Sequence, residues 1–506
     1  MSSNKKVFKN TFILYFRGGV TLLIGLYSSR ILLKSLGVED FGIYNVVGGI
    51  VGLFSFLHYS LSDSTTRFLN LSINDSFGNF NKVFNSSLVL HFILAFLILV
   101  LSETIGLWFF YNKMNIPNNR VDIAFWVYQF SVIASIISIL QVPYDSAILS
   151  KEKIDVYAYI SVLESFLKLF ITFVISYIEI DRLFSYSLLL LILYFIIRLV
   201  YQIYCRLKIP ETKFAFNYDS KVIKDMFVFF SWIIFGNLSV ITFYQGVNLL
   251  QNMFFGAVIN ASIAIGNQIK GSMDTVAGNF LTAIRPRIYN AYIKGEIDEL
   301  RNLLYDSSRF SFLLICFISI PIYFNVDTVL VLWLGSVPNY SNIFIKMLII
   351  TMIINSCFYS LSTIIHAIGK LFIFSSITGF FYILGVLLTY YFLKSGYPPT
   401  TPYFVQILLS LLIGLSNLLI VRYYIKELTI LKFFAKVILR IFIIFLISFL
   451  GCKFIGGYFY KNNVYITAIL QIVFNTSIIL IIGLNNAERN MVKNKLLSKL
   501  SNKTLE

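Results

Sequence analysis

Two pairs of oppositely charged residues stand one helical turn apart inside long apolar stretches of this sequence. Lys168 follows Glu164 by four residues, and Asp274 follows Lys270 by four. A four-residue spacing places both members of a pair on one face of a helix. A charge at bilayer depth costs roughly 2.5 to 3.5 kcal/mol, so such residues face protein or a water-filled cavity. The pairs predict either a cationic cavity whose acids exchange a proton or cation, or internal ion pairs that lower the cost of insertion.

Amide side chains accompany the second pair. In the stretch 257 to 284, the polar residues Asn260, Asn267, Lys270 and Asp274 recur at steps of three, four and seven residues, which places them on one helical stripe. The preceding apolar stretch adds three more amides, Asn237, Gln245 and Asn248. These amides could bind sugar hydroxyls or form hydrogen bonds between helices.

Five further charges lie within apolar stretches: Arg17, Arg30, Glu103, Arg198 and Lys346. Arg17 and Arg30 lie towards opposite ends of the first stretch, and the 13 residues between them correspond to about 220° around a straight helix. They cannot both face one cavity unless that helix bends, and either can instead extend to the lipid headgroups. Glu103 has no partner in its own stretch, which suggests ion coupling or an interhelical hydrogen bond.

Other chemistries lack their residue patterns. The three histidines and four cysteines show no metal-ligand spacing, and no nucleotide-binding loop or hydrolase motif is present. The loops are too short to hold a catalytic domain. We therefore expect neither an enzyme nor a bound cofactor or metal. The net charge of +17 is dispersed among apolar segments, so a nucleic-acid partner is not expected either.

The elements that position these residues are long apolar segments. Of the 506 residues, 58% are hydrophobic and 13% charged, and the mean hydropathy is +0.80. This composition predicts an all-α polytopic membrane protein of about 14 transmembrane helices. The predicted spans are 11–33, 42–62, 88–110, 121–142, 156–178, 184–204, 227–250, 257–284, 309–333, 343–365, 371–393, 402–423, 436–456 and 464–484.

The basic residues predict the orientation. With a cytoplasmic N-terminus, and with bases at span ends counted with their loops, 28 of the 41 Lys and Arg residues fall inside and seven outside. This bias follows the positive-inside rule. We expect both termini in the cytoplasm and a location in a bacterial inner membrane.

The hydropathy pattern repeats. Spans 1 to 6 match spans 7 to 12 in order, and each half has an even number of spans. Two parallel six-helix lobes are typical of transporters that bind substrate near the midplane. The predicted parts are an N-terminal lobe (1–206), a basic cytoplasmic linker (207–226), a C-terminal lobe (227–425) and two extra helices with a basic tail (426–506).

Three stretches resemble a known family. The segments "SSRILLKSLGVEDFGIYNVVGGIVGLF", "YDSAILSKEKIDVYAYISVLESFLKL" and "AIRPRIYNAY" resemble bacterial polysaccharide (O-antigen, Wzx-type) flippases of the multidrug/oligosaccharidyl-lipid/polysaccharide exporter superfamily, over about residues 7 to 425. The resemblance implies ion-coupled alternating access that moves an undecaprenyl-diphosphate-linked O-antigen or capsule repeat unit. It also implies H⁺ or Na⁺, membrane lipid, and polysaccharide polymerase and chain-length proteins as partners.

On this interpretation, basic residues of the cavity hold the diphosphate and amides bind the sugars. The expected substrate-binding residues are Lys168, Lys270, Arg17, Arg30, Gln245, Asn248 and Asn267, and the expected ion-coupling residues are Glu103, Glu164 and Asp274. The nearest alternative is a multidrug and toxin exporter, although six bases against three acids within the spans disfavour a cation substrate. An integral-membrane polysaccharide polymerase or ligase usually has a large external loop, which is not found here.

Overall fold

The computed structural model of the chain describes residues 3–52, 55–73, 79–459, 463–486 and 488–490. Within these ranges the regular structure is entirely helical, which confirms the predicted fold class. Among the described residues, eleven helices are long and apolar enough to cross a membrane, and they coincide with eleven of the 14 predicted spans. The predicted span 42–62 falls on the second half of α1 and on α2. The predicted spans 227–250 and 257–284 fall within α8, which has 36 residues, and α9, which has 37.

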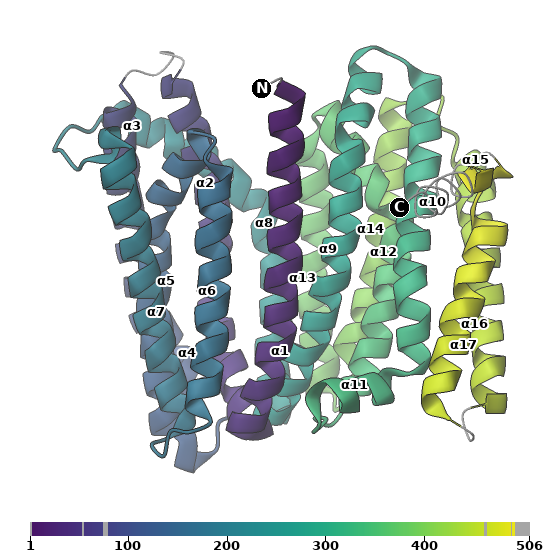
Figure 1. Cartoon of the computed structure of the whole chain (residues 1–506), viewed down its shortest axis with the longest axis horizontal. Coiled ribbons are helices and arrows are strands. Elements are labelled where there is room, and N and C mark those ends of the chain that lie inside the picture. The colour runs from purple at the N-terminus through teal and green to yellow at the C-terminus, as the bar shows by residue number, and fades with distance from the viewer. Residues whose placement is uncertain (1–2, 53–54, 74–78, 460–462, 487, 491–506) are drawn as a thin grey trace, which may run out of the picture. The chain divides into compact units, whose positions relative to one another are not determined.

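The chain forms two compact units. Unit 1 comprises residues 1–268, 333–341 and 378–405, and unit 2 comprises 269–332, 342–377 and 406–506. Five helices, labelled in Figure 1, therefore contribute residues to both units: α9 (Ala257–Ile293), α11 (Val326–Leu334), α12 (Ser341–Ile368), α13 (Leu371–Lys394) and α14 (Thr401–Tyr424).

The helices of the first half begin in unit 1. They are α1 (Ser3–Gly52), α2 (Ser55–Ile73), α3 (Phe80–Leu101), η1 (Ser102–Gly106), α4 (Leu107–Lys113), η2 (Asn118–Arg120), α5 (Val121–Ser150), α6 (Ile154–Ile175), α7 (Arg182–Lys208), η3 (Pro210–Thr212) and α8 (Ser220–Phe255). Within unit 1, α5 packs against α2, α3 and α7, and α1 packs against α6. Figure 1 shows α5, α6 and α7 running alongside one another.

Gly37 divides α1. Its backbone has φ 79° and ψ 172°, a conformation that residues with a side chain rarely adopt. The chain bends there, so the first predicted span and the start of the second form one element with a kink. The connection implied between the predicted spans 11–33 and 42–62 is therefore this kink. The helix after it carries Ile43, Val46 and Val47 into a core with α4, α5 and the start of α9.

Ion pairs join helix ends in unit 1. Arg120 pairs with Asp181 at 2.5 Å and also with Asp40, which follows the α1 kink. Asp181 in addition caps α7 by accepting from the Phe184 N–H at 3.0 Å. Burial would raise the pKa of Asp181, but the hydrogen bonds from Arg120 and the α7 backbone lower it overall. This Arg120 cluster holds the starts of α5 and α7 to the kink of α1.

The helices of the second half are α9 (Ala257–Ile293), α10 (Ile297–Phe324), α11 (Val326–Leu334), α12 (Ser341–Ile368), α13 (Leu371–Lys394), α14 (Thr401–Tyr424), α15 (Ile430–Phe433), η4 (Phe434–Ile438), α16 (Leu439–Phe459), α17 (Val464–Ile478) and η5 (Ile479–Gly483). In unit 2, α16 and α17 pack against α10. Asn475 donates to the Cys316 carbonyl at 3.1 Å, and Asn325 donates to Gln471 at 2.5 Å. The two extra C-terminal helices thus belong to the core of unit 2.

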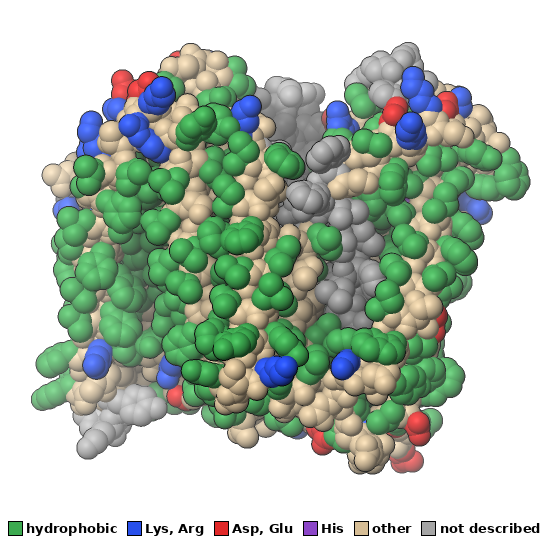
Figure 2. Space-filling model, turned by 180° about the vertical axis from the view of Figure 1, so that it is seen from behind, with side chains coloured by type: hydrophobic (Ala, Val, Ile, Leu, Met, Phe, Trp, Pro, Cys, Tyr) green, Lys and Arg blue, Asp and Glu red, His purple; other side chains and the backbone are tan. Residues whose placement is uncertain are grey.

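The surface matches a membrane-spanning protein. On the face shown in Figure 2, hydrophobic side chains cover the middle, and the visible charged side chains gather towards the two ends. Large apolar residues such as Phe92, Phe96 and Phe195 are more than half exposed. Such exposure is expected where lipid replaces water as the solvent.

Candidate functional site

An amide-lined cavity of about 290 Å³ lies in unit 1 between the second part of α1, α8 and α9. It contains all three amides that the sequence suggested for substrate. The lining residues are Tyr44, Asn45, Gly48, Gln245, Asn248, Asn260, Ile263, Ala264 and Asn267. The lining carries no formal charge, so the cavity is suited to neutral groups that donate and accept hydrogen bonds, such as sugar hydroxyls.

The amide side chains around the cavity differ in their hydrogen-bond partners within the protein. Asn260 donates to the side-chain oxygen of Asn248 at 2.7 Å and receives a bond from Asn252 at 3.1 Å. Asn252 in turn accepts from the Asn115 N–H at 2.8 Å. These bonds join α8 to α9 and to the loop before α5, so Asn248 acts in packing.

Gln245 and Asn267 stand apart from this network. Within the part of the chain that the structure describes, neither side chain has a hydrogen-bond partner, and the Asn267 residue is exposed. Their amide groups are therefore available to a ligand in the cavity.

Tyr44 connects the cavity with the Lys168–Glu164 pair. Its ring makes an edge contact with Tyr186 of α7 at 5.0 Å between centroids. The Tyr44 hydroxyl interacts electrostatically with Lys168 of α6 and Tyr194 of α7. The cation of the Lys168–Glu164 ion pair thus acts electrostatically on Tyr44, one wall residue of a cavity whose lining has no charge.

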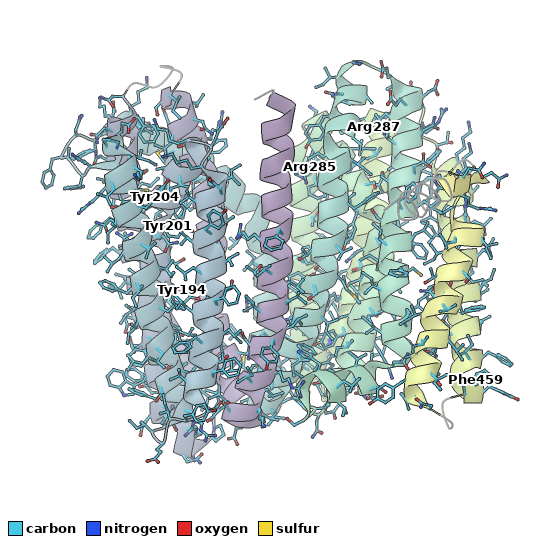
Figure 3. All side chains as sticks on the ribbon, in the orientation of Figure 1. Tyr194, Tyr201, Tyr204, Arg285, Arg287 and Phe459 are labelled. Carbon is cyan, nitrogen blue, oxygen red and sulfur yellow. The ribbon has the colours of Figure 1, made fainter. Side chains whose placement is uncertain are left out.

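The predicted pair on α6 is formed. Lys168 Nζ lies 2.6 Å from Glu164 Oε1 and 4.9 Å from the centre of the Tyr194 ring. The lysine side chain is 36% exposed and that of the glutamate 24%. Figure 3 shows Tyr194, Tyr201 and Tyr204 following one another along α7. Tyr194 contributes a cation–π contact that holds the Lys168 ammonium group.

Arg17 and Arg30 are placed differently. The Arg17 guanidinium stacks on the Tyr157 ring of α6, 4.6 Å from its centre, and the residue is half-buried. Arg30 is exposed and lies before the kink at Gly37. The two arginines share the same helical segment, so the bend at Gly37 does not bring them to one face.

Asp145 is an acid that the sequence analysis missed. It is 4% exposed, accepts from Gln141 Nε2 at 3.2 and 3.3 Å, and interacts electrostatically with Glu164, Arg198 and Arg17. The predicted span ended at residue 142, whereas α5 continues through Pro143 to Ser150. The apolar residues "AIL" at 147–149 were the sequence signal that could have indicated a helix continuing past residue 142. The structure therefore shows a buried acid, Asp145, that interacts electrostatically with Arg17 of α1 and Arg198 of α7.

Glu103 lies in another part of unit 1. It belongs to η1, a π-helical turn, and accepts from Gln129 of α5 at 3.2 Å. The side chain is partly buried. Its contact with α5 matches the interhelical hydrogen bond that the sequence left open beside ion coupling.

The second predicted pair lies in unit 2. Lys270 Nζ is 2.6 Å from Asp274 Oδ2, with side-chain exposures of 17% and 37%. The Tyr359 hydroxyl of α12 donates to the other oxygen of Asp274 at 3.1 Å. Asp274 is thus held by Lys270 of its own helix and by the phenol of Tyr359 on α12.

The comparisons with known proteins begin at the level of sequence. No family model matches the chain. A protein of Bacillus subtilis (strain 168), described as the uncharacterized membrane protein EpsK, is 20% identical over 326 residues. The match covers 64% of this chain and 64% of that protein, which is less than two thirds of the relative.

Solved structures give a broader match. A multidrug resistance MATE family transporter of the MOP superfamily, in an inward-facing conformation, is similar with a TM-score of 0.64 and 14% identity, over 80% of this chain and 95% of that one. The lipid II flippase MurJ, in an inward closed conformation, has a TM-score of 0.64 and 13% identity, over 93% and 98%. A MOP superfamily transporter from Pyrococcus furiosus Vc1 (DSM3638) has a TM-score of 0.51 and 14% identity, over 83% and 94%. The chain therefore has the all-helical fold of MOP-superfamily transporters and flippases.

Proposed function

We propose that this protein is a flippase that moves an undecaprenyl-diphosphate-linked oligosaccharide, an O-antigen or capsule repeat unit, from the cytoplasmic to the periplasmic leaflet by alternating access. The observation that carries this proposal is the uncharged, amide-lined cavity whose wall residue Tyr44 interacts electrostatically with Lys168. A glycan needs hydrogen-bonding groups without charge, and a diphosphate needs a cation. Unit 1 contains both the uncharged amides of the cavity and the cation Lys168.

The proposal assigns roles to the two kinds of side chain. Gln245 and Asn267 bind glycan hydroxyls, and Asn248 keeps the cavity wall in place. Lys168 binds the diphosphate. The remaining proposed diphosphate ligands are Lys270, Arg17 and Arg30. Charge-assisted hydrogen bonds to phosphate oxygens are stronger than neutral ones, so each base that contacts the diphosphate contributes to affinity.

Transport is proposed to be coupled to H⁺ or Na⁺. The candidate groups are Glu103, Glu164 and Asp274, to which the structure adds the buried Asp145. Protonation of Asp145 or Glu164 would change the charge around Arg17 and Arg198, and so the attraction for a diphosphate. The protein would lie in a bacterial inner membrane with both termini in the cytoplasm, beside a polysaccharide polymerase and chain-length proteins.

The alternative is a cation antiporter like the multidrug MATE transporters. It is supported by an equal TM-score of 0.64 to a transporter of that class and by the ion pairs that neutralise Lys168 and Lys270. An exporter of organic cations would use Glu164, Asp274 or Asp145 as its binding carboxylate.

Deletion of the gene in the native bacterium separates the two functions. The flippase proposal predicts loss of surface polysaccharide and accumulation of the undecaprenyl-diphosphate-linked repeat unit in the cytoplasmic leaflet, both reversed by the wild-type gene. Normal polysaccharide together with increased sensitivity to cationic drugs would refute it and favour the antiporter.

A further inference from the structure

A second cavity, of about 360 Å³, lies in unit 2 where α10, η4 and α16 meet. We call it the basic pocket. It is lined by Asn302, Tyr305, Asp306 and Arg309 of α10, Ala435 and Lys436 of η4, and Arg440 of α16. None of these residues belongs to the transport site proposed above.

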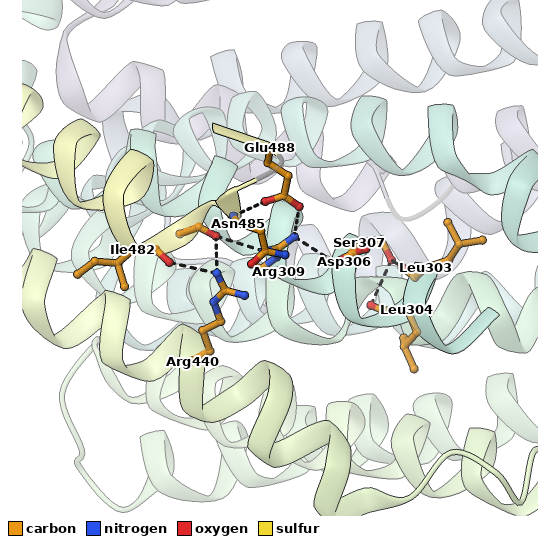
Figure 4. Close-up of polar contacts among 10 residues, drawn as sticks. Leu303, Leu304, Asp306, Ser307, Arg309, Arg440, Ile482, Asn485 and Glu488 are labelled. Carbon is orange, nitrogen blue, oxygen red and sulfur yellow. Dashed lines mark hydrogen bonds and ion pairs between the residues drawn. The ribbon is translucent and has the colours of Figure 1, made fainter. Parts of the chain in front are cut away.

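Arg309 forms the charged floor of the basic pocket. It is 3% exposed, donates to Asp306 at 3.0 Å, and also pairs with Glu488, which follows η5 (Figure 4). The two carboxylates outnumber this guanidinium by one, so the three bases Arg309, Lys436 and Arg440 against these two acids leave a net charge of +1. Arg309 therefore serves mainly to fix the floor of the pocket.

Two other bases of the pocket are not balanced in this way. Arg440 donates to the carbonyls of Ile482 and Gly483 at 3.2 and 3.3 Å, as Figure 4 shows. Lys436 is exposed, with its Nζ 5.9 Å from the centre of the Tyr305 ring. Within the described parts of the chain, neither has a carboxylate within ion-pair distance. Since carbonyls carry no net charge, the pocket keeps an excess of positive charge.

Tyr305 supplies an unused hydrogen-bond donor. The residue is 8% exposed, and its hydroxyl is buried without a hydrogen-bond partner among the described residues. Buried hydroxyls are normally paired, so this one has an open donor position for an acceptor, whether water or a bound group. A phosphate oxygen accepts from a phenol, an ammonium group and a guanidinium alike.

The surroundings indicate what carries the phosphate. Lys436 and Arg440 lie at the start of the predicted span 13, and the residues after them expose apolar side chains: Leu439 by 56%, Phe442 by 55% and Ile443 by 43%. An apolar surface beside a basic pocket at a helix end fits a phospholipid, with its headgroup in the pocket and its acyl chains along α16. Basic pockets between transmembrane helices are known to recruit anionic headgroups.

We propose that the basic pocket binds the phosphate of an anionic membrane phospholipid, held by Lys436, Arg440 and the Tyr305 hydroxyl. The lipid would bridge α10, η4 and α16, and so attach the two extra C-terminal helices to the rest of unit 2.

The test compares lipid retention by the purified full-length protein. Protein would be incorporated into phosphatidylcholine nanodiscs with and without phosphatidylglycerol, re-extracted in detergent, and the co-purifying lipid measured by mass spectrometry. We expect selective retention of phosphatidylglycerol and a higher unfolding temperature in its presence. Lys436→Gln/Arg440→Gln should reduce retention by on the order of tenfold or more, as for loss of charge-assisted bonds. Tyr305→Phe should reduce it less and leave the fold intact.

Lys432→Gln is the matched control, because Lys432 is an exposed base on α15 that does not line the pocket. It should retain phosphatidylglycerol as the wild type does. Equal loss in this control, or full retention in monodisperse Lys436→Gln/Arg440→Gln, would overturn the proposal. Inorganic phosphate would also be compared directly: if it stabilises the protein, if Lys436→Gln/Arg440→Gln removes that stabilisation, and if no lipid is retained, then the pocket binds free phosphate and the proposal of a phospholipid is wrong.

Discussion

Neutralising the Lys168–Glu164 pair separates the two interpretations that the sequence leaves open. If the pair only lowers the cost of burying charge, removing both charges together should leave transport intact. If Lys168 also contacts the substrate, transport should fail even though no unpaired charge remains. The informative variant is the double replacement Glu164→Gln/Lys168→Met, which keeps the side-chain sizes similar.

The structure sets the expected magnitudes. The pair spans four residues, and its side chains are 36% and 24% exposed, so the ion pair itself contributes about 0.3 to 0.5 kcal/mol to stability. The contact with the Tyr194 ring adds roughly 0.5 to 1 kcal/mol. A charge-assisted hydrogen bond from Lys168 to a diphosphate would contribute about 1.5 to 3 kcal/mol, or roughly ten- to 150-fold in apparent affinity.

The assay is surface polysaccharide in a deletion strain, measured together with the amount of protein in the membrane. Glu164→Gln/Lys168→Met should be present at near-normal abundance but reduce polymer at least tenfold at limiting substrate. Glu164→Gln alone keeps the cation, so polymer close to the wild-type level in it would assign the loss in the double variant to Lys168, whereas an equal loss would assign it to Glu164 as an ion-coupling residue. Lys453→Met, which removes an exposed base of α16, serves as the control and should have no effect. Wild-type polymer in the double variant would refute a role for Lys168 in substrate binding.

Three further predictions concern other residues. Gln245→Ala and Asn267→Ala should reduce transport without changing the unfolding temperature. Asn260→Ala should instead destabilise by about 1 to 3 kcal/mol, because it leaves Asn248 Oδ1 without its donor. Parallel transport and thermal unfolding measurements check this difference. Because Arg120 and the α7 backbone lower the pKa of Asp181 overall, the charged pair stabilises the fold above the ordinary carboxyl pKa of about 3.9 and is lost as pH falls through the lower folded-state pKa. Asp181→Asn, which can still cap α7, should therefore lower the free energy of unfolding by about 1 kcal/mol at neutral pH. The unfolding temperatures of this variant and the wild type should converge in acid. A difference in unfolding temperature that stays constant as the pH falls would contradict this explanation. Gly42→Ala should destabilise by at least 1 to 3 kcal/mol, since its Cβ would lie 1.9 Å from the Ala257 carbonyl oxygen, whereas Gly19→Ala, with nothing within 4 Å, should be tolerated in the same thermal assay.

The sequence was most informative about the helices themselves, because a continuous apolar run of about 20 residues has few alternatives in a bilayer. Helix ends were less predictable. Hydropathy does not show that α5 continues through Pro143, and so Asp145 was assigned to a loop. Likewise the predicted span 309–333 is divided between α10 and the short α11. Arg309, the first residue of that predicted span, lies well inside α10, which begins at Ile297, and pairs there with Asp306 and Glu488.

The polar residues of the site show the same limit. Periodicity correctly placed Lys168 with Glu164 and Lys270 with Asp274, since partners four residues apart on one helix need no tertiary information. The gathering of Gln245 and Asn267 around a cavity with Tyr44 depends on how α1, α8 and α9 pack. Hydrogen bonding between helices is one of the two roles that the sequence leaves open for Asn248, but its partner Asn260 could not be predicted, because a single helix does not reveal its partners.

The most direct test of the central claim is flipping in proteoliposomes. Purified protein would be reconstituted with a fluorescent undecaprenyl-diphosphate-linked oligosaccharide, and a membrane-impermeant reagent would report its movement between leaflets under an imposed ion gradient. The flippase account predicts protein-dependent movement that is lost in Glu164→Gln/Lys168→Met and persists in Lys453→Met. Transport of an organic cation by the same proteoliposomes, with no movement of the lipid-linked oligosaccharide, would contradict it.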